Sequence, residues 1–199
     1  MGKNHANVDP YVVSRVRALE SLLLERGILA PDAVDKVVRR YGEATGPLVG
    51  ARAVARAWRD PGYKRLLLED SKAALAALGL HFDRLVVVEN TPAVHNLVVC
   101  TLCSCYPWDV LGLPPTWYKL PAYRSRAVSE PRQVLREFGV EIPADRDVRV
   151  WDSSAEVRYM VLPQRPAGTE GFDDAELVRL IPRDALIGVA EVTLPPVRA

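Results

Sequence analysis

The three cysteines of the chain all lie within the six-residue segment Cys100-Thr-Leu-Cys-Ser-Cys105. A disulfide-stabilised fold spreads its cysteines along the sequence, so this clustering indicates local chemistry instead. The segment follows the run Leu97-Val98-Val99, which is typical of a short buried strand. The chain must therefore build its core without crosslinks and present a cysteine-bearing turn at the end of a strand.

Size and charge narrow the possible classes of protein. The 199 residues, 49% of them hydrophobic, suffice for one core, or for one core with an appendage. A net charge of +1, from 26 basic and 25 acidic side chains, argues against a nucleic-acid or anionic-membrane partner. No apolar run approaches the roughly 18 residues that span a bilayer, and Met1 to Asp9 lack an apolar signal core. We therefore expect no membrane partner and a cytoplasmic location.

The first 80 residues read as helical. Asp9-Pro10 predicts a capped helix that ends near Gly27, and further helices are expected near Pro31, over 49–58 and over 63–78. The pattern then changes to short β-branched runs, at 85–88 and 97–99, which predict strands. We expect an α+β fold with an N-terminal helical arm followed by a layered α/β/β/α metal-binding body. The expected division is a helical region at 1–80 and an α/β metal-binding catalytic domain at 81–199.

The remaining expectations concern the second half of the chain. Residues 148–151 and 157–162 look like a hairpin around Asp152-Ser153-Ser154. Helices are expected over 130–138 and 173–180, and a last strand over 185–192.

Three interpretations of the cysteines compete. A structural zinc needs four protein ligands, and the spare candidates are only His81 and His95. Three buried thiols, or a strained Cys103–Cys105 disulfide, are the second interpretation. In the third, a trivalent metal binds the three sulfurs and the deprotonated backbone amides between them, which leaves a sixth position open for Lewis-acid chemistry.

The cysteine segment resembles the metal-binding motif of nitrile hydratase α subunits and of the related thiocyanate hydrolase γ subunit. The resemblance extends over nearly the whole chain, in the following segments: 16–20, 27–29, 57–61, 88–91, 106–108, 111–115, 123–126, 130–132, 150–154 and 162–169. The family's reaction is the addition of water to a nitrile to give an amide, so the resemblance implies a hydro-lyase.

The resemblance also implies a role for each residue of the motif. Cys100 corresponds to an axial thiolate, Cys103 to a cysteine sulfinic acid and Cys105 to a cysteine sulfenic acid, and the amides of Ser104 and Cys105 complete the metal ligands. Thr101 is typical of members that take non-corrin, low-spin Co³⁺, whereas members with serine take Fe³⁺, which stays the alternative metal. Cys105, Cys103 and Ser104 are the expected catalytic residues, with either the Cys105 sulfenate or a water as the nucleophile.

Partners and pocket follow from the same resemblance. The family implies a β subunit, as one chain or split into two, whose arginines bind the oxygenated cysteines, and a cobalt-insertion activator protein. Trp108 and Asp109 are candidate substrate-pocket residues for a small-molecule nitrile, although Trp108 suits a core equally well. Asp109 departs from the family, which commonly has proline there. For Asp152 and Arg158, hydrogen bonds to the metal-binding segment compete with a plain hairpin turn and a surface arginine.

Other functions stay open at this point. They are a thiocyanate hydrolase-type subunit, the α subunit of a toyocamycin nitrile hydratase, and a non-catalytic cobalt carrier or maturation partner. The segment Leu111 to Pro115 favours nitrile hydratase.

Overall fold

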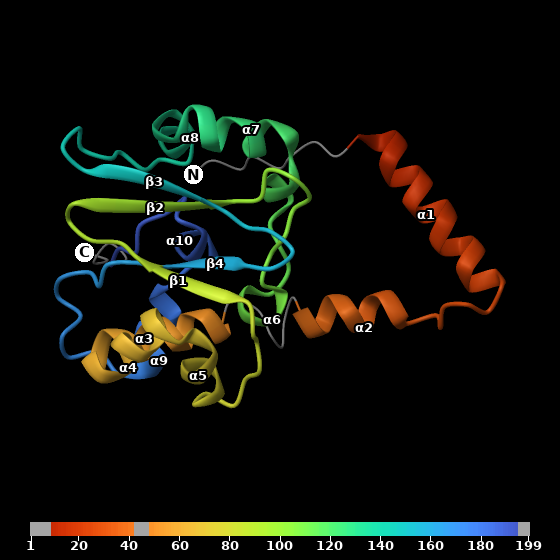
Figure 1. The fold of residues 1–199 in the computed structure, drawn as a ribbon. Coiled ribbons are helices and arrows are strands. Elements are labelled where there is room, and N and C mark those ends of the chain that lie inside the picture. The colour runs from red at the N-terminus through yellow and green to blue at the C-terminus, as the bar shows by residue number, and fades with distance from the viewer. Residues whose placement is uncertain (1–8, 42–47, 195–199) are drawn as a thin grey trace, which may run out of the picture.

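The computed structural model describes residues 9–41 and 48–194 (Figure 1). Helices dominate the first part, as the sequence predicts: α1 (Pro10–Glu25), α2 (Ala33–Arg39), α3 (Leu48–Arg59), α4 (Pro61–Glu69) and α5 (Ser71–Ala76). The rest alternates strands and short helices: β1 (Leu85–Glu89), β2 (Val94–Val99), α6 (Trp108–Leu111), the 3₁₀ helix η2 (Thr116–Lys119), α7 (Pro121–Ser129), α8 (Pro131–Glu137), β3 (Asp147–Asp152), β4 (Arg158–Leu162), α9 (Asp174–Leu180) and α10 (Arg183–Ile187). None of the described helices is both long and apolar enough to cross a bilayer.

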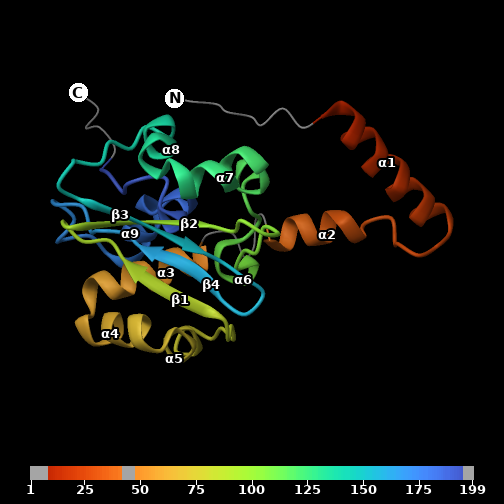
Figure 2. The same ribbon diagram turned by 45° about the horizontal axis from the view of Figure 1, so that its top comes forward.

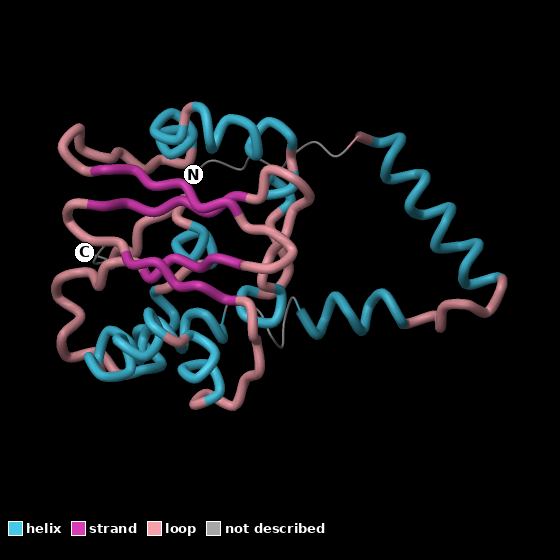
Figure 3. The backbone as a smooth tube through the Cα atoms, in the orientation of Figure 1, coloured by secondary structure: helices cyan, strands magenta, loops and turns pink. Residues whose placement is uncertain are grey.

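The strands form two parallel ladders. β1 pairs with β4, and β2 pairs with β3 so that Val99 stands opposite Asp152. Helices α7 and α8 cover the β2–β3 side, whereas α3, α4, α5 and α9 cover the β1–β4 side (Figures 1 and 3). This arrangement confirms the predicted α+β class and its layered body. The carboxyl ends of β2 and β3 meet at one edge, where the cysteine segment begins.

Helix α3 joins the helical layer to the rest of the core. Its buried face consists mostly of small side chains: Ala51, Ala53, Val54, Ala55 and Ala57. A Cβ atom on Gly50 would lie 2.7 Å from Cδ2 of Leu111, so this glycine allows the close approach of α3 to α6. The helical region up to residue 80 therefore shares a core with the strands from α3 onward. The proposed division at residue 80 stays a prediction.

Helices α1 and α2 form an arm that projects away from the body (Figures 1 and 2). The Asp9 carboxylate accepts the Tyr11 N–H at 2.9 Å, which confirms the predicted N-terminal cap. Neither helix has a buried residue, and the arm leaves large apolar side chains exposed: Tyr11, Val12, Val16, Leu19, Leu22, Val34, Val37 and Val38. A contiguous apolar surface of this kind marks an interaction site.

Two predicted elements are wrong. The expected hairpin around Asp152 does not form, because β3 and β4 pair with β2 and β1 instead of with each other. Ser153 continues the β2–β3 ladder through its N–H, which donates to Val99 at 2.7 Å, and the chain then crosses to the other ladder. The expected last strand at 185–192 begins instead as α10, which ends at Gly188 in a left-handed conformation. A short apolar run fits a buried helix as well as a strand, which explains this error.

Candidate metal centre

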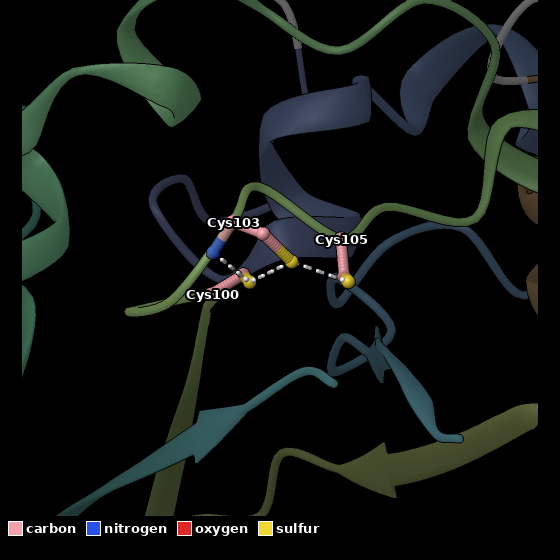
Figure 4. A group of neighbouring side chains, drawn as sticks. All are labelled: Cys100, Cys103 and Cys105. Carbon is pink, nitrogen blue, oxygen red and sulfur yellow. Dashed lines mark hydrogen bonds between the residues drawn. The ribbon is translucent and has the colours of Figure 1, made fainter. Parts of the chain in front are cut away.

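The cysteine loop, defined as residues 100–105, leaves the end of β2 and leads toward α6. Cys100 has no exposed surface and so belongs to the core, whereas Cys103 is exposed and Cys105 is half-buried. Figure 4 shows the three side chains turned toward one another. The loop is therefore anchored at its first cysteine and opens outward at the second and third.

The three sulfur atoms converge on one point. Sγ of Cys103 lies 3.6 Å from that of Cys100 and 2.9 Å from that of Cys105, and all three lie within 4.8 Å of one another. All three cysteines are free thiols, so the disulfide interpretation is not supported. Among the described residues, this cluster contains no histidine or carboxylate, and the zinc interpretation therefore lacks its fourth ligand.

The backbone of the loop turns its amides inward. The N–H groups of Cys103 and Ser104 point at Sγ of Cys100, at 3.3 and 3.1 Å. Ser104 has φ +88°, a left-handed conformation that costs free energy for any residue with a side chain. This conformation bends the chain where the amides of Cys103 and Ser104 face the Cys100 sulfur. Soft thiolates and converging backbone nitrogens suit a transition metal, so the residues fit the predicted cobalt.

The thiols differ in acidity. Burial, the largest influence, raises the pKa of Cys100, but the backbone N–H groups of Cys103, Cys105 and Ser104 lower it to about 7. Burial raises the pKa of Cys105 to about 12, and the Cys103 thiol and the charge of Cys100 add to this effect. Of Cys100 and Cys105, Cys100 is therefore the thiol that more readily binds as a thiolate.

Side chains from three other elements hold the cysteine loop. The Asp152 carboxylate, at the end of β3, accepts the Thr101 N–H at 2.9 Å and its hydroxyl at 2.5 Å. Arg124 of α7 donates to the carbonyls of Cys100 and Thr101, and Tyr118 of η2 donates to that of Cys105 at 3.0 Å. The loop is thus fixed by hydrogen bonds at both ends.

Sequence reasoning identified these supporting residues only in part. The sequence offers Asp152 for a hydrogen bond to the metal-binding segment, and the structure shows two, both donated by Thr101. Arg158 instead donates to the carbonyl of Ser154. No local pattern in the sequence marks Arg124 or Tyr118, because their role depends on tertiary packing.

Three further candidate residues, His95, Trp108 and Asp109, lie outside the cysteine loop. His95 is fully buried and lies 2.7 Å from the Gly188 carbonyl through Nε2, as a structural histidine does. Trp108 begins α6 and is half-buried. Asp109 is exposed and makes no hydrogen bond or ion pair within the described ranges.

Fold and site together define a metal-binding subunit with three cysteines at the carboxyl edge of a parallel ladder. The family model described as "Nitrile hydratase, alpha chain" matches residues 11–190. The chain is 54% identical over 187 residues to the low-molecular weight cobalt-containing nitrile hydratase subunit alpha of Rhodococcus rhodochrous, covering 92% of this chain and 90% of that one. The chain belongs to the nitrile hydratase α-chain family, as its resemblance predicts.

Other relatives mark the breadth of the family. Thiocyanate hydrolase subunit gamma of Thiobacillus thioparus is 42% identical over 187 residues, covering 87% of this chain and 76% of the relative. Among solved structures, a double mutant of the Fe-type nitrile hydratase from Comamonas testosteroni Ni1 matches with a TM-score of 0.86 at 41% identity, covering 96% of this chain and 98% of that one. A recombinant thiocyanate hydrolase matches with a TM-score of 0.75 at 38% identity, covering 96% and 97%.

Proposed function

We propose that the chain is the α subunit of a cobalt nitrile hydratase, which adds water to a nitrile to give the corresponding amide. The observation that carries this proposal is the convergence of three sulfurs and inward-facing amides in a member of the nitrile hydratase α family. A non-catalytic cobalt carrier is disfavoured, since the relatives matched over most of the chain are enzyme subunits.

Cobalt is the metal that the relatives favour. The family members from Rhodococcus rhodochrous and Pseudonocardia thermophila, at 50–54% identity, are described as cobalt-containing. Thr101 agrees, because its resemblance to the cobalt-type motif predicts the same metal. Iron stays the alternative, since the Fe-type enzyme of Comamonas testosteroni Ni1 has a similar structure. Bound Co³⁺ supplies a Lewis acid that draws electrons from a nitrile and makes its carbon electrophilic.

We assign each residue of the cysteine loop a role according to its position and exposure. Cys100 is buried and acidic enough to anchor as a thiolate, while the Ser104 and Cys105 amides complete the ligands. Cys103 and Cys105 lie on the accessible side, so a nitrile approaches next to them. We assign Cys105, as its sulfenate, to attack on the nitrile carbon or to orienting a water, and Cys103 to hydrogen bonding with the partner.

The side of the cysteine loop that carries Cys103 is exposed, and we expect a partner subunit to cover it. Leu102, at the tip, is 85% exposed, and a hollow of about 320 Å³ lies between the neighbouring Thr101 and α7. An apolar tip next to a hollow, together with the apolar arm, fits a large permanent interface, typically above about 2,000 Å². Since the relatives are subunits of larger enzymes, we propose a β subunit, as one chain or split into two, and a cobalt-insertion activator.

The partner proposal has a direct test in the arm. Leu19→Asp places a carboxylate on the apolar face of α1, and Glu20→Asp is its matched control. We expect Leu19→Asp to weaken co-purification of the β subunit while the helical circular dichroism of the chain stays unchanged. Full assembly by Leu19→Asp would contradict an arm that clasps the partner.

Turnover tests the reaction itself. The complex, matured with cobalt, is assayed for amide formation from acetonitrile and benzonitrile and, in parallel, for hydrolysis of thiocyanate. We expect amide formation and no thiocyanate hydrolysis, and much less activity from the chain without its partner. Hydrolysis of thiocyanate without nitrile hydration would assign the chain to the thiocyanate hydrolase branch. Cobalt binding without either activity would support a carrier.

Two finer points complete the proposal. We place Trp108 and Asp109 at the wall of the substrate pocket, because they lie three and four residues after the last cysteine of the loop. We also propose the cytoplasm as the compartment, since three free thiols in a metal-binding cluster suit a reducing environment.

A further inference from the structure

The last described residue of the arm contacts the first helix after the cysteine loop. Tyr41 and Trp108 pack edge to face, with ring centroids 5.6 Å apart and an interplanar angle of 88°. This is the geometry that aromatic pairs prefer, because the positive edge of one ring meets the negative face of the other. The arm therefore reaches the body at a residue next to the metal-binding segment.

A backbone hydrogen bond fixes the same junction. The Leu113 N–H donates to the Tyr41 carbonyl at 3.2 Å, so the arm is bound to the segment that follows α6. Arg183 donates to the Leu113 carbonyl from the other side. Because Trp108 begins the four-residue helix α6 and Leu113 lies two residues after its end, Tyr41 contacts the chain at the start of this helix and just beyond it.

The Trp108 ring has a second neighbour. Nζ of Lys119 lies 5.5 Å from its centroid, within range of a cation–π contact. Trp108 is half-buried and packs with part of its surface against the core of the body. Tyr41 adds an edge-to-face contact from the arm to the same ring, which Lys119 approaches from the body.

We propose that Tyr41 is a positioning residue that orients Trp108 and so sets how large a nitrile the pocket accepts. This inference rests on the proposed function and on Trp108 lining the pocket. Because Tyr41 belongs to the arm, seating of the arm on a partner also orders the pocket wall. Tyr41 acts only through Trp108 and does not touch the metal-binding cysteines.

The first test follows Trp108 by ¹⁹F NMR. The full chain is labelled with 5-fluorotryptophan and combined with its unlabelled partner, and the Trp108 signal among the four tryptophans is assigned with Trp108→Phe. We expect Tyr41→Ala to shift this signal and leave the others in place, and Tyr41→Phe to shift it much less. Tyr159→Ala is the matched control, since Tyr159 is also half-buried but packs against another tryptophan, Trp151, with ring centroids 5.1 Å apart, and should shift that signal instead.

The second test separates binding from chemistry. We expect Tyr41→Ala to change KM for benzonitrile relative to acetonitrile by ~2–10-fold, the equivalent of one aromatic pair. The kcat for acetonitrile and the cobalt content should stay near those of the parent complex, and Tyr41→Phe should restore the KM ratio. Tyr159→Ala should leave the ratio unchanged.

The outcomes are distinct from those of the proposed function. An unmoved Trp108 signal in Tyr41→Ala overturns the positioning role, and so does a moved signal with an unchanged KM ratio. Loss of cobalt or of acetonitrile turnover in Tyr41→Ala would show a general structural role and would also overturn it. If the parent complex hydrates no nitrile, the proposed function and the substrate-size role both fail, while the NMR test still decides whether Tyr41 positions Trp108.

Discussion

Replacing Asp152 with asparagine tests how far the cysteine loop depends on its support. The carboxylate accepts two hydrogen bonds from Thr101, at 2.9 and 2.5 Å. Asparagine keeps nearly the same shape and one acceptor oxygen, but it loses the negative charge and the second acceptor. Hydrogen bonds to a charged group contribute about 1.5–3 kcal/mol each when buried, and less at an exposed site such as this one.

The expected cost follows from those contacts. Taking about 1 kcal/mol for each of the two weakened bonds gives a loss of about 2 kcal/mol in loop ordering, or roughly 30-fold in an equilibrium constant. Since the metal binds only the ordered loop, its apparent affinity should fall by a similar factor, within the 10–100-fold range that is usual for groups supporting metal ligands.

The assay is cobalt per complex after maturation at limiting cobalt. Asp152→Asn should require a markedly higher cobalt concentration for half-loading. Asp147→Asn is the matched control, because Asp147 lies at the other end of β3 and its side chain forms no hydrogen bond or ion pair within the described ranges. Equal loading of the two variants at every cobalt concentration would refute the supporting role of Asp152.

Three further predictions address the core, a buried histidine and the chemistry. Gly188 has φ +93°, and a Cβ atom there would lie 2.0 Å from the Asn96 carbonyl oxygen. Gly188→Ala should therefore destabilise the complex by about 3 kcal/mol, which lowers Tm by about 6–12 °C. Gly171→Ala should leave Tm unchanged, because a Cβ atom on Gly171 meets no atom within 4 Å. Burial lowers the pKa of His95 from its usual value of 6.5. Below about pH 6.5 the unfolded state therefore binds more protons than the folded state, and the free energy of unfolding should decrease as the pH is lowered, by up to about 1.4 kcal/mol per pH unit. His95→Gln should flatten this dependence in denaturant titrations. Cys105→Ser should lose most nitrile turnover even where cobalt is retained, since serine cannot form a sulfenate, and near-normal turnover with cobalt bound would contradict that role.

The sequence predicts the features that depend on neighbouring residues. The cap at Asp9, the strands before and after Asn90, and the cluster of three cysteines each follow from short-range patterns, and the structure confirms them. Spacing alone brings the sulfurs of a tight turn together, so the metal site was predictable without the fold.

Features that depend on distant pairing were not predictable in this way. Both ladders are parallel, and such pairing needs a crossover that no local pattern specifies, so the sequence favours a hairpin for β3 and β4 that the structure does not contain. Helix α7 lies in a proline-rich stretch for which the sequence predicts no helix, and Pro121 occupies its first turn, where proline is tolerated. Arg124 and Tyr118 reach the cysteine loop, and Tyr41 reaches Trp108, only through tertiary packing.

The central claim is that the three cysteines hold one cobalt and become chemically different from each other. High-resolution mass spectrometry of the purified complex, combined with metal analysis, measures this directly. We expect about one cobalt per chain, an unmodified Cys100, two oxygen atoms on Cys103 and one on Cys105. Stoichiometric zinc or iron, or three cysteines with identical modification in an active complex, would contradict the account.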